Sequence, residues 1–170
     1  VKKMPPMVEK RTASTRDTMT DQVPQTRIYR TWNIPAVDSE VTDRMNLVSQ
    51  VLGGSRSSRL DKRLVFQDKL ADSVSAFAWG SELGGLFIVQ VDVKQGVDPA
   101  KVEAALDEEL NKLIATGPTE AELAQAKTVI EAGFVRGIER IGGFGGKADV
   151  LAECAVFTGD PACYAKTLSV

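Results

Sequence analysis

Histidine is absent from the 170 residues of this sequence. Imidazole supplies ligands in most hydrolytic zinc sites, and it is the usual general base near neutral pH. The absence excludes a Ser-His-Asp triad and a Cys-His nucleophile outright. We therefore expect no catalytic residue, no metal ligand and no cofactor of its own in this segment.

Cysteine is scarce as well, because Cys154 and Cys163 are the two in the chain. Two thiols cannot complete a structural zinc site without other ligands. The turn signal Gly159-Asp160-Pro161 lies between them and could bring their sulfur atoms together. Two interpretations stay open: a pair of buried free thiols, or one disulfide, as in an oxidising compartment such as a periplasm.

Long apolar runs and an excess of charge are also missing. No run approaches the roughly 18 residues of a membrane-spanning helix, and we recognise no signal peptide. The 21 basic and 23 acidic residues give a net charge of −2, which shows no electrostatic footprint for a nucleic-acid partner or an anionic lipid surface. The chain starts at Val1 rather than Met, and we interpret it as a segment cut from a longer protein.

Three stretches have the composition of β-strands. Residues 25–34 are rich in β-branched and aromatic side chains and are followed by Pro35. Residues 71–80 place Val74, Ala76 and Ala78 on one side, and residues 84–93 follow after a short connection, which predicts an antiparallel hairpin. Residues 1–22, rich in Pro and Thr, are predicted as a lead-in segment with an edge strand.

Helical spacing follows the first strand. Asp38 or Ser39 can cap a helix that ends at Gly53-Gly54, and a second helix can start at Ser57. The predicted inward side chains are Val41, Met45, Val48 and Leu52 in the first helix, and Leu60, Leu64 and Phe66 in the second.

Further helices follow the hairpin. Asp98-Pro99 is a typical helix start and Gly117-Pro118 a typical stop. A capping box at residues 119–122 begins a long helix, and residues 147–157 and 161–168 are short helical candidates after a glycine-rich break. The order of elements predicts an α+β fold, a mostly antiparallel sheet covered on one face by helices.

The glycine-rich break, Gly142-Gly143-Phe144-Gly145-Gly146, is the first candidate for chemistry. Such a segment could cradle a phosphate at the start of the following helix. It lacks the Lys-Ser/Thr pair of a phosphate loop, and no strand precedes it. We favour a hinge or a tight turn between helices.

The loop between the first two helices is the second candidate. Gly53, Gly54, Arg56 and Arg59 could hold an anion, but a polar loop between a helix stop and a helix start is the simpler interpretation. Carboxylates on the later helices could do acid–base work, although a solvated face or a dipole-complementing first turn explains them better. These carboxylates are Glu103, Asp107, Glu108, Glu109, Glu120 and Glu122.

Five blocks of sequence occur in a specific order: residues 25–35 (QTRIYRTWNIP), 51–60 (VLGGSRSSRL), 70–76 (LADSVSA), 84–88 (GGLFI) and 117–127 (GPTEAELAQAK). Together they resemble the second, metal-free domain of the insulinase-like (pitrilysin-type) zinc metallopeptidases, a family that includes mitochondrial processing peptidase. The likeness is greatest to long bacterial members. It implies that residues 23–170 are a non-catalytic domain with the LuxS/insulinase-like metallopeptidase fold, truncated at its C-terminal end.

The resemblance also implies a division of labour. One domain of such a peptidase carries the zinc motif His-x-x-Glu-His, and homologous metal-free domains close a chamber around unfolded peptide. The loop with Gly53, Gly54, Arg56 and Arg59 stands where the resemblance implies a substrate-side loop, although it is shorter here than the glycine-rich loop of mitochondrial processing peptidase. The implied partners are the zinc-bearing domain of the same parent, the opposite half of the chamber and unfolded peptides, and an excised fragment could self-associate through apolar surface. Bacterial relatives are often exported, which implies a periplasmic or cell-envelope location, with the cytoplasm as the alternative.

One pair of functional side chains in the family has no counterpart here. The domain opposite the zinc usually carries an Arg and, seven residues later, a Tyr, which hold and polarise the substrate. This chain has Val65 after Leu64, and Asp72 at the Tyr position, while Arg63 lies ahead of the motif. Substrate polarisation by this domain is therefore not expected. The alternative function is that of a scaffold or partner subunit in an inactive family member with an assembly role.

Overall fold

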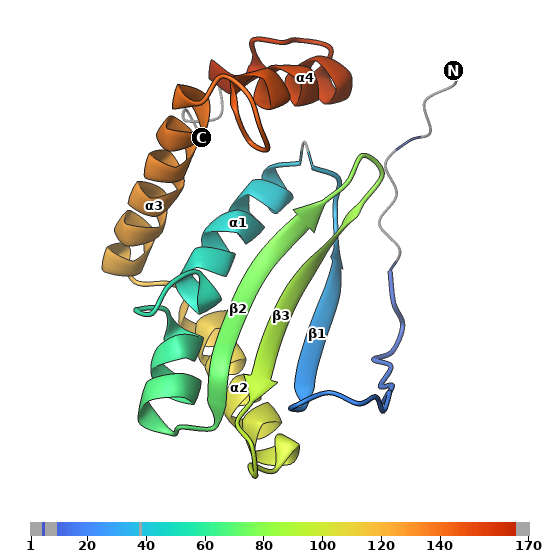
Figure 1. The fold of residues 1–170 in the computed structure, drawn as a ribbon, viewed down its shortest axis with the longest axis vertical. Coiled ribbons are helices and arrows are strands. Elements are labelled where there is room, and N and C mark those ends of the chain that lie inside the picture. Colours follow the sequence, from blue (N-terminus) through green and yellow to red (C-terminus); the bar gives the residue numbers. More distant parts are fainter. Residues whose placement is uncertain (1–4, 6–9, 38, 166–170) are drawn as a thin grey trace. The chain divides into compact units, whose positions relative to one another are not determined.

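The computed structural model describes residue 5 and residues 10–37 and 39–165, and they fall into two compact units that divide between Thr119 and Glu120 (Figure 1). The division lies inside the predicted domain of residues 23–170. The first unit contains the sheet, and the second is helical in its described part.

The sheet of the first unit has three antiparallel strands in the order β1-β3-β2. β1 spans Arg27–Ile34, β2 spans Ala71–Gly80 and β3 spans Gly85–Val93, so the predicted strand and the predicted hairpin are confirmed. Directly opposed residues share a face of the sheet. The register therefore sets Val74 beside Val91 on one face, and Phe77 beside Ile88 on the other.

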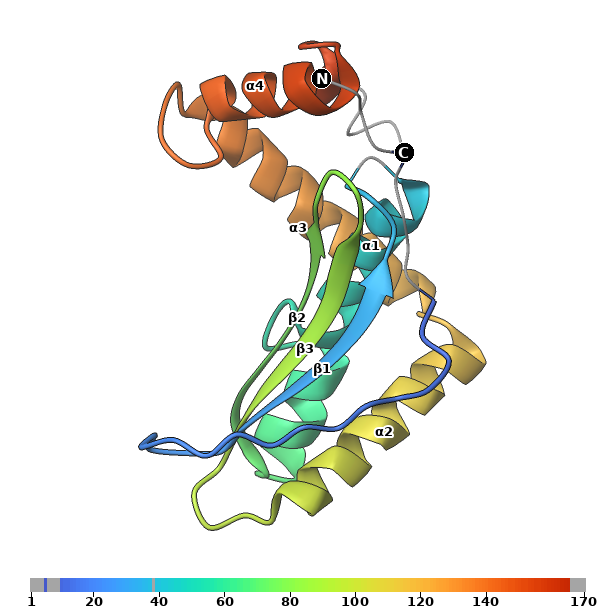
Figure 2. The same ribbon diagram turned by 90° about the vertical axis from the view of Figure 1, so that its right-hand side faces the viewer.

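Helices pack on the first of these faces. α1 spans Glu40–Gly53, the π-helix η1 spans Asp61–Gln67 and α2 spans Pro99–Thr116. α1 and η1 pack on β2, while Arg30 of β1 donates to Asp107 of α2 over 2.7 Å. Figure 2 shows these helices on the same side of the sheet. The α+β prediction with helices on one face is thereby confirmed.

The core lies between the strands and these helices. Alternate residues of β2 and β3 point toward it, because successive side chains of a strand point to opposite faces. The side chains with no exposed area are Leu60, Leu64, Val89, Val91, Val102 and Leu106. The strand members of this set, Val89 and Val91, fix the register of the hairpin. A slip by one residue would turn both side chains from the core to the opposite face of the sheet.

Local capping positions α1 and α2 as the sequence predicts. The Ser39 hydroxyl accepts from the Val41 amide over 3.2 Å, and the Asp98 carboxylate accepts from the Ala100 amide over 3.0 Å. α2 ends at Gly117, whose φ of +70° suits glycine. The alternative cap, Asp38, lies outside the described residues.

Two expectations for α1 and η1 are wrong. Val41 is 44% exposed and Phe66 is 52% exposed, although both were expected on the inner side. Residues 61–67 form a π-helix, with the Asp68 amide bonded to the Arg63 carbonyl oxygen five residues earlier. Phe66 follows Leu64 by two residues, which at about 100° per residue is a rotation of about 200° around an α-helix. Phe66 therefore faces away from Leu64, and the π-helical turn does not bring the two side chains together.

The expected edge strand of the lead-in is also wrong for the residues described there. Residues 10–22 contain no strand, and every one of them is exposed. They have no alternation of buried apolar side chains, which is what fixes the register of a strand. The segment follows α2 in an irregular conformation (Figure 2).

The second unit contains α3, Glu120–Glu139, and α4, Lys147–Thr158, separated by the glycine-rich turn. The long helix after the capping box and the short helix after the glycines are therefore confirmed. Ala126 of α3 and Cys154 of α4 are the buried residues of these helices. Of the second short helix, predicted over 161–168, residues 161–165 are described, and they form a turn and one short 3₁₀ segment.

Candidate functional site

The loop after α1 is held by packing at its start. A Cβ atom built on Gly53 would lie 2.6 Å from the Ala76 amide nitrogen and 2.9 Å from the Ser75 carbonyl carbon. Gly53 therefore lets the end of α1 approach the backbone of β2. This contact gives Gly53 a structural role without any ligand.

The rest of the loop is closed by its own hydrogen bonds. The Ser55 carbonyl oxygen accepts from the Ser58 amide over 3.0 Å and from the Ser58 hydroxyl over 2.6 Å. Arg59 donates to the Gly117 carbonyl oxygen over 3.1 Å, at the C-terminal end of α2, where a cation is favourable. Gly54 and Arg56 are the members of the predicted set that are exposed. The structure thus brings the four candidates to one connection, with Gly53 at the end of α1 and Arg59 in the helical turn that follows, and the contacts of Gly53 and Arg59 serve the fold.

The glycine-rich turn between α3 and α4 has little donor capacity left for an anion. The backbone amides of residues 145–148 all donate within the turn, and a bound phosphate would need such amides. The acceptors are the Asp149 carboxylate for Gly145 (3.0 Å), and the carbonyl oxygens of Gly143, Arg140 and Ile141 for Gly146, Lys147 and Ala148 (3.0, 2.7 and 3.1 Å). The tight turn, and not the phosphate cradle, is the interpretation these contacts support.

The carboxylates of α2 form ion pairs. Glu103 accepts two hydrogen bonds from Arg16, both of 2.6 Å, and these bonds hold the pKa of Glu103 below its ordinary value. Asp107 binds Arg30, and Glu109 accepts from Lys112 over 2.6 Å. A general acid at neutral pH needs a raised pKa, so the lowered pKa of Glu103 favours its role as an ion-pair partner.

Arg63 is also occupied within the fold. Its guanidinium donates to the Asp68 carboxylate over 2.5 Å and to the Glu108 carboxylate over 3.1 Å. Asp72, which stands at the family's Tyr position, is exposed beside the irregularity in β2 between Ala71 and Ser73. In this fold Arg63 therefore serves as an ion-pair partner of Asp68 and Glu108.

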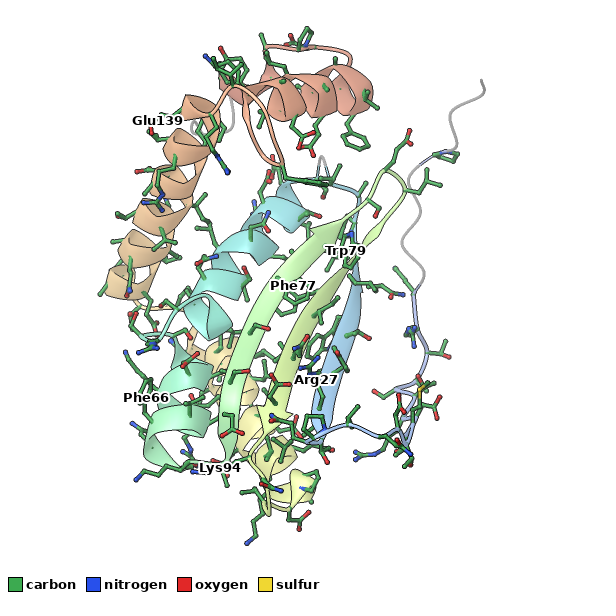
Figure 3. All side chains as sticks on the ribbon, viewed as in Figure 1. Arg27, Phe66, Phe77, Trp79, Lys94 and Glu139 are labelled. Carbon is green, nitrogen blue, oxygen red and sulfur yellow. A yellow bond between two sulfur atoms is a disulfide. The ribbon has the colours of Figure 1, made fainter. Side chains whose placement is uncertain are left out.

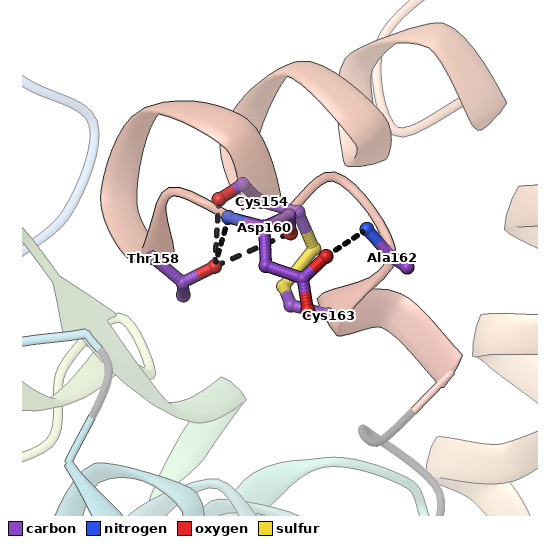
Figure 4. Close-up of a disulfide and its surroundings, with 5 residues drawn as sticks. All are labelled: Cys154, Thr158, Asp160, Ala162 and Cys163. Carbon is purple, nitrogen blue, oxygen red and sulfur yellow. Dashed lines mark hydrogen bonds between the residues drawn. A yellow bond between two sulfur atoms is a disulfide. The ribbon is translucent and has the colours of Figure 1, made fainter.

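The two cysteines are joined in the structure. Cys154 of α4 is 6% exposed, and its Cα atom lies 5.5 Å from that of Cys163. Figure 4 shows the disulfide and the turn that brings the sulfur atoms together. The Thr158 hydroxyl donates to the Cys154 carbonyl oxygen over 2.8 Å, and the Asp160 carboxylate accepts from the Ala162 amide over 2.9 Å. The turn between the cysteines therefore positions Cys163 next to Cys154.

The disulfide leads to a direct chemical prediction. Unfolded protein treated with iodoacetamide without reductant should gain no carbamidomethyl group, because both thiols are bonded. After reduction with dithiothreitol it should gain two. Intact-mass spectrometry of freshly purified protein measures both states. Labelling of two thiols before reduction would instead show that the cysteines are the buried free pair.

Within the described part of the first unit, the face of the sheet that α1, η1 and α2 leave uncovered, hereafter the helix-free face, carries large apolar side chains. Trp79 is 64% exposed and Phe77 is 37% exposed, and they are two residues apart on β2 (Figure 3). Leu86 lies opposite Trp79 and is 38% exposed, while Tyr29 of β1 is 58% exposed. The other end of the face is polar, because Arg27 pairs there with Asp92.

The sequence predictions missed this surface. The prediction for residues 71–80 covered the small side chains that face the core, Val74, Ala76 and Ala78. The aromatic residues Phe77 and Trp79 occupy the intervening positions and point to the opposite face. Two aromatic side chains at positions i and i+2 of an amphipathic strand were the available signal, since they share a face.

No group of three or more potential metal ligands comes together among the residues that the structure describes. In the same part of the chain, no helix has the length and apolarity needed to cross a membrane. Without histidine, the residues present do not fit a hydrolytic zinc centre.

Comparison with known sequences decides the family. The family model described as "Peptidase M16 inactive domain" matches residues 1–130. The chain belongs to this family. The resemblance to insulinase-like zinc metallopeptidases is thereby confirmed. No match was found among curated proteins.

Solved structures share the fold of this M16 inactive domain. A protease from Helicobacter pylori is 20% identical with a TM-score of 0.75, covering 88% of this chain and 35% of that protein. The inactive peptidase domain of a Bordetella parapertussis protein classed as a zinc protease is 21% identical with a TM-score of 0.67, covering 89% and 81%. The M16 inactive domain from Pseudomonas fluorescens is 20% identical with a TM-score of 0.58, covering 64% and 26%.

The M16 inactive domain described here therefore spans about a third of the Helicobacter pylori protease (35%) and about a quarter of the Pseudomonas fluorescens chain (26%). Its family and its fold are established by these matches. The exposed surface of the domain is the basis for a proposal about the function of a larger protein that contains it.

Proposed function

We propose that this domain helps to enclose and bind unfolded peptide in a zinc metallopeptidase, while the zinc site lies in another domain of the same parent. The family match supports the non-catalytic assignment, and the lack of histidine supports placing the zinc ligands elsewhere. Zinc there would activate water for attack on a peptide bond. The residues of this chain would contribute surface to that reaction.

The observation that carries the proposal is the helix-free face of the sheet. A patch of exposed apolar side chains on one face marks an interaction surface more often than a random feature. Trp79, Phe77 and Leu86 are neighbours in the register, and no full charge lies between them. An unfolded peptide offers apolar side chains that a folded protein hides, so it is the occupant that this surface suits.

Peptide binding by the chain itself tests the proposal. We expect a fluorescein-labelled, reduced and alkylated polypeptide to bind saturably, as followed by fluorescence anisotropy. Phe77→Ser and Trp79→Ser together should raise the Kd by roughly tenfold or more, because aromatic anchors dominate such surfaces. Zinc plays no part in this measurement.

Ile114→Ser is the matched control, since Ile114 is 82% exposed but lies on α2. It should leave the Kd unchanged. Absence of saturable binding by the unsubstituted chain would contradict the peptide role, and would leave the zinc-bearing domain, the opposite half of the chamber or a second copy of this chain as the occupant of the face.

The assembly role is distinguished by the parent sequence. An intact His-x-x-Glu-His elsewhere in the parent polypeptide would agree with a peptidase whose zinc lies outside this domain. A parent without that motif would favour a scaffold, or a partner subunit that completes another chain.

We also propose a periplasmic or cell-envelope location, which the Cys154–Cys163 disulfide supports because disulfides persist in oxidising compartments.

A further inference from the structure

We propose that Arg16 is an ionic clip that holds residues 10–22 of the lead-in along α2, and that salt or loss of Glu103 releases this segment. The inference concerns the chain itself and does not depend on the proposed function. It rests on a two-bond contact between residues 87 positions apart in the sequence.

The geometry of the clip is specific. Arg16 donates from Nη1 to Glu103 Oε2 and from Nη2 to Glu103 Oε1, each over 2.6 Å. Such a fork-to-fork arrangement fixes orientation as well as distance, and a lysine cannot reproduce it. The Arg16 side chain is 74% exposed, whereas that of Glu103 is 17% exposed. The clip therefore joins a largely buried carboxylate on the helix to an exposed guanidinium on the lead-in.

Glu103 is held in place independently of Arg16. Arg30 of β1 lies 3.8 Å from Glu103 Oε2 and binds Asp107, one turn further along α2, through two hydrogen bonds of 2.7 and 3.1 Å. The two arginines flank the Glu103 carboxylate from the lead-in and from the sheet. Glu103 thus remains a positioned acceptor whether or not Arg16 occupies it.

The lead-in has few other attachments. Within residues 10–25, the remaining hydrogen bonds are local ones, such as Arg11 to the Thr15 hydroxyl over 3.2 Å and the Val23 amide to the Asp21 carbonyl oxygen over 3.0 Å. The next long-range contact is at Thr26, whose carbonyl oxygen accepts from the Val93 amide at the start of β1. A segment tied at one point between its ends is released when that point opens.

The rate of tryptic cleavage after Arg16 reports whether the clip is open. Cleavage after Arg16 requires its guanidinium to enter the protease's acidic specificity pocket, and Glu103 holds the same group. In Glu103→Gln, the rate of cleavage at the Arg16–Asp17 bond should rise roughly two- to fivefold, the range expected for an exposed pair. Arg16→Lys, which keeps the cleavage site and the charge but loses the fork, should be cleaved at an intermediate rate.

Glu108→Gln is the matched control, because Glu108 lies on the same helix and binds Arg63 instead. It should leave cleavage after Arg16 unchanged. Raising NaCl to about 0.5 M should accelerate this cleavage in the unsubstituted chain relative to Glu103→Gln, since salt screens the pair. Equal rates in the unsubstituted chain and Glu103→Gln, or an equal rise in Glu108→Gln, would overturn the clip. Circular dichroism of each variant separates local release from unfolding.

Discussion

Leu106→Ala is expected to lower the free energy of unfolding of the first unit by about 2–5 kcal/mol. Leu106 lies on α2 and has no exposed area. The substitution removes three carbon atoms of the Leu106 side chain from the layer between α2 and the sheet. It leaves a cavity, because the neighbouring side chains on the strands are held too rigidly to fill the space. A loss of this size is large against the total stability of a domain.

Urea denaturation followed by circular dichroism measures this loss. Ile114→Ala is the control on the same helix, because Ile114 is 82% exposed, and it should change the unfolding free energy by less than about 0.5 kcal/mol. Similar losses in the two variants would mean that α2 does not bury the face toward the sheet that the structure assigns to it.

Gly53→Ala is the second large effect, with an expected loss of about 1–3 kcal/mol. The added methyl group would meet the Ala76 amide nitrogen at 2.6 Å, and that atom belongs to the backbone of β2. A side chain could rotate away, but a backbone in a hydrogen-bonded strand has to shift with its neighbours. The end of α1 would therefore separate from β2.

The measurement for Gly53→Ala also tests whether the loop has a binding role. If Gly53 serves packing, its unfolding free energy falls while peptide affinity per folded molecule is unchanged. The control is Gly133→Ala in the middle of α3, where an added Cβ atom meets nothing within 4 Å. That variant should gain up to about 1 kcal/mol, because alanine has less conformational freedom to lose in a helix. Losses of the same sign in both would argue against close packing at Gly53.

The segments with clear local signals were predictable. Ser39 and Asp98 cap helices as their chemistry indicates, and the alternation around Val74 and Ala76 sets the inner face of β2. These features depend on backbone donors and on side-chain periodicity within a few residues. Contacts between distant residues therefore do not alter them.

Phe66 and the lead-in show where local patterns fail. Phe66 follows Leu64 by only two residues, a spacing that places the two side chains on opposite sides of a helix. The local sequence also does not report that the hydrogen bonds of η1 close after five residues. Composition alone does not reveal that residues 10–22 lack a buried side, since an edge strand and an irregular strap are both rich in polar residues. In both places the neighbouring elements, which the local sequence does not contain, decide the conformation.

The sequence by itself determined the absence of a histidine-based catalytic centre, the α+β order of elements and the likeness to the insulinase-like metallopeptidases, because each depends on residue identity or order along the chain. Tertiary structure alone decided which residues meet: Arg16 with Glu103, Arg59 with the end of α2, and Gly53 with the backbone of β2. Contacts of this kind join residues far apart in sequence, and their presence follows from the packing of whole elements, which no local pattern encodes.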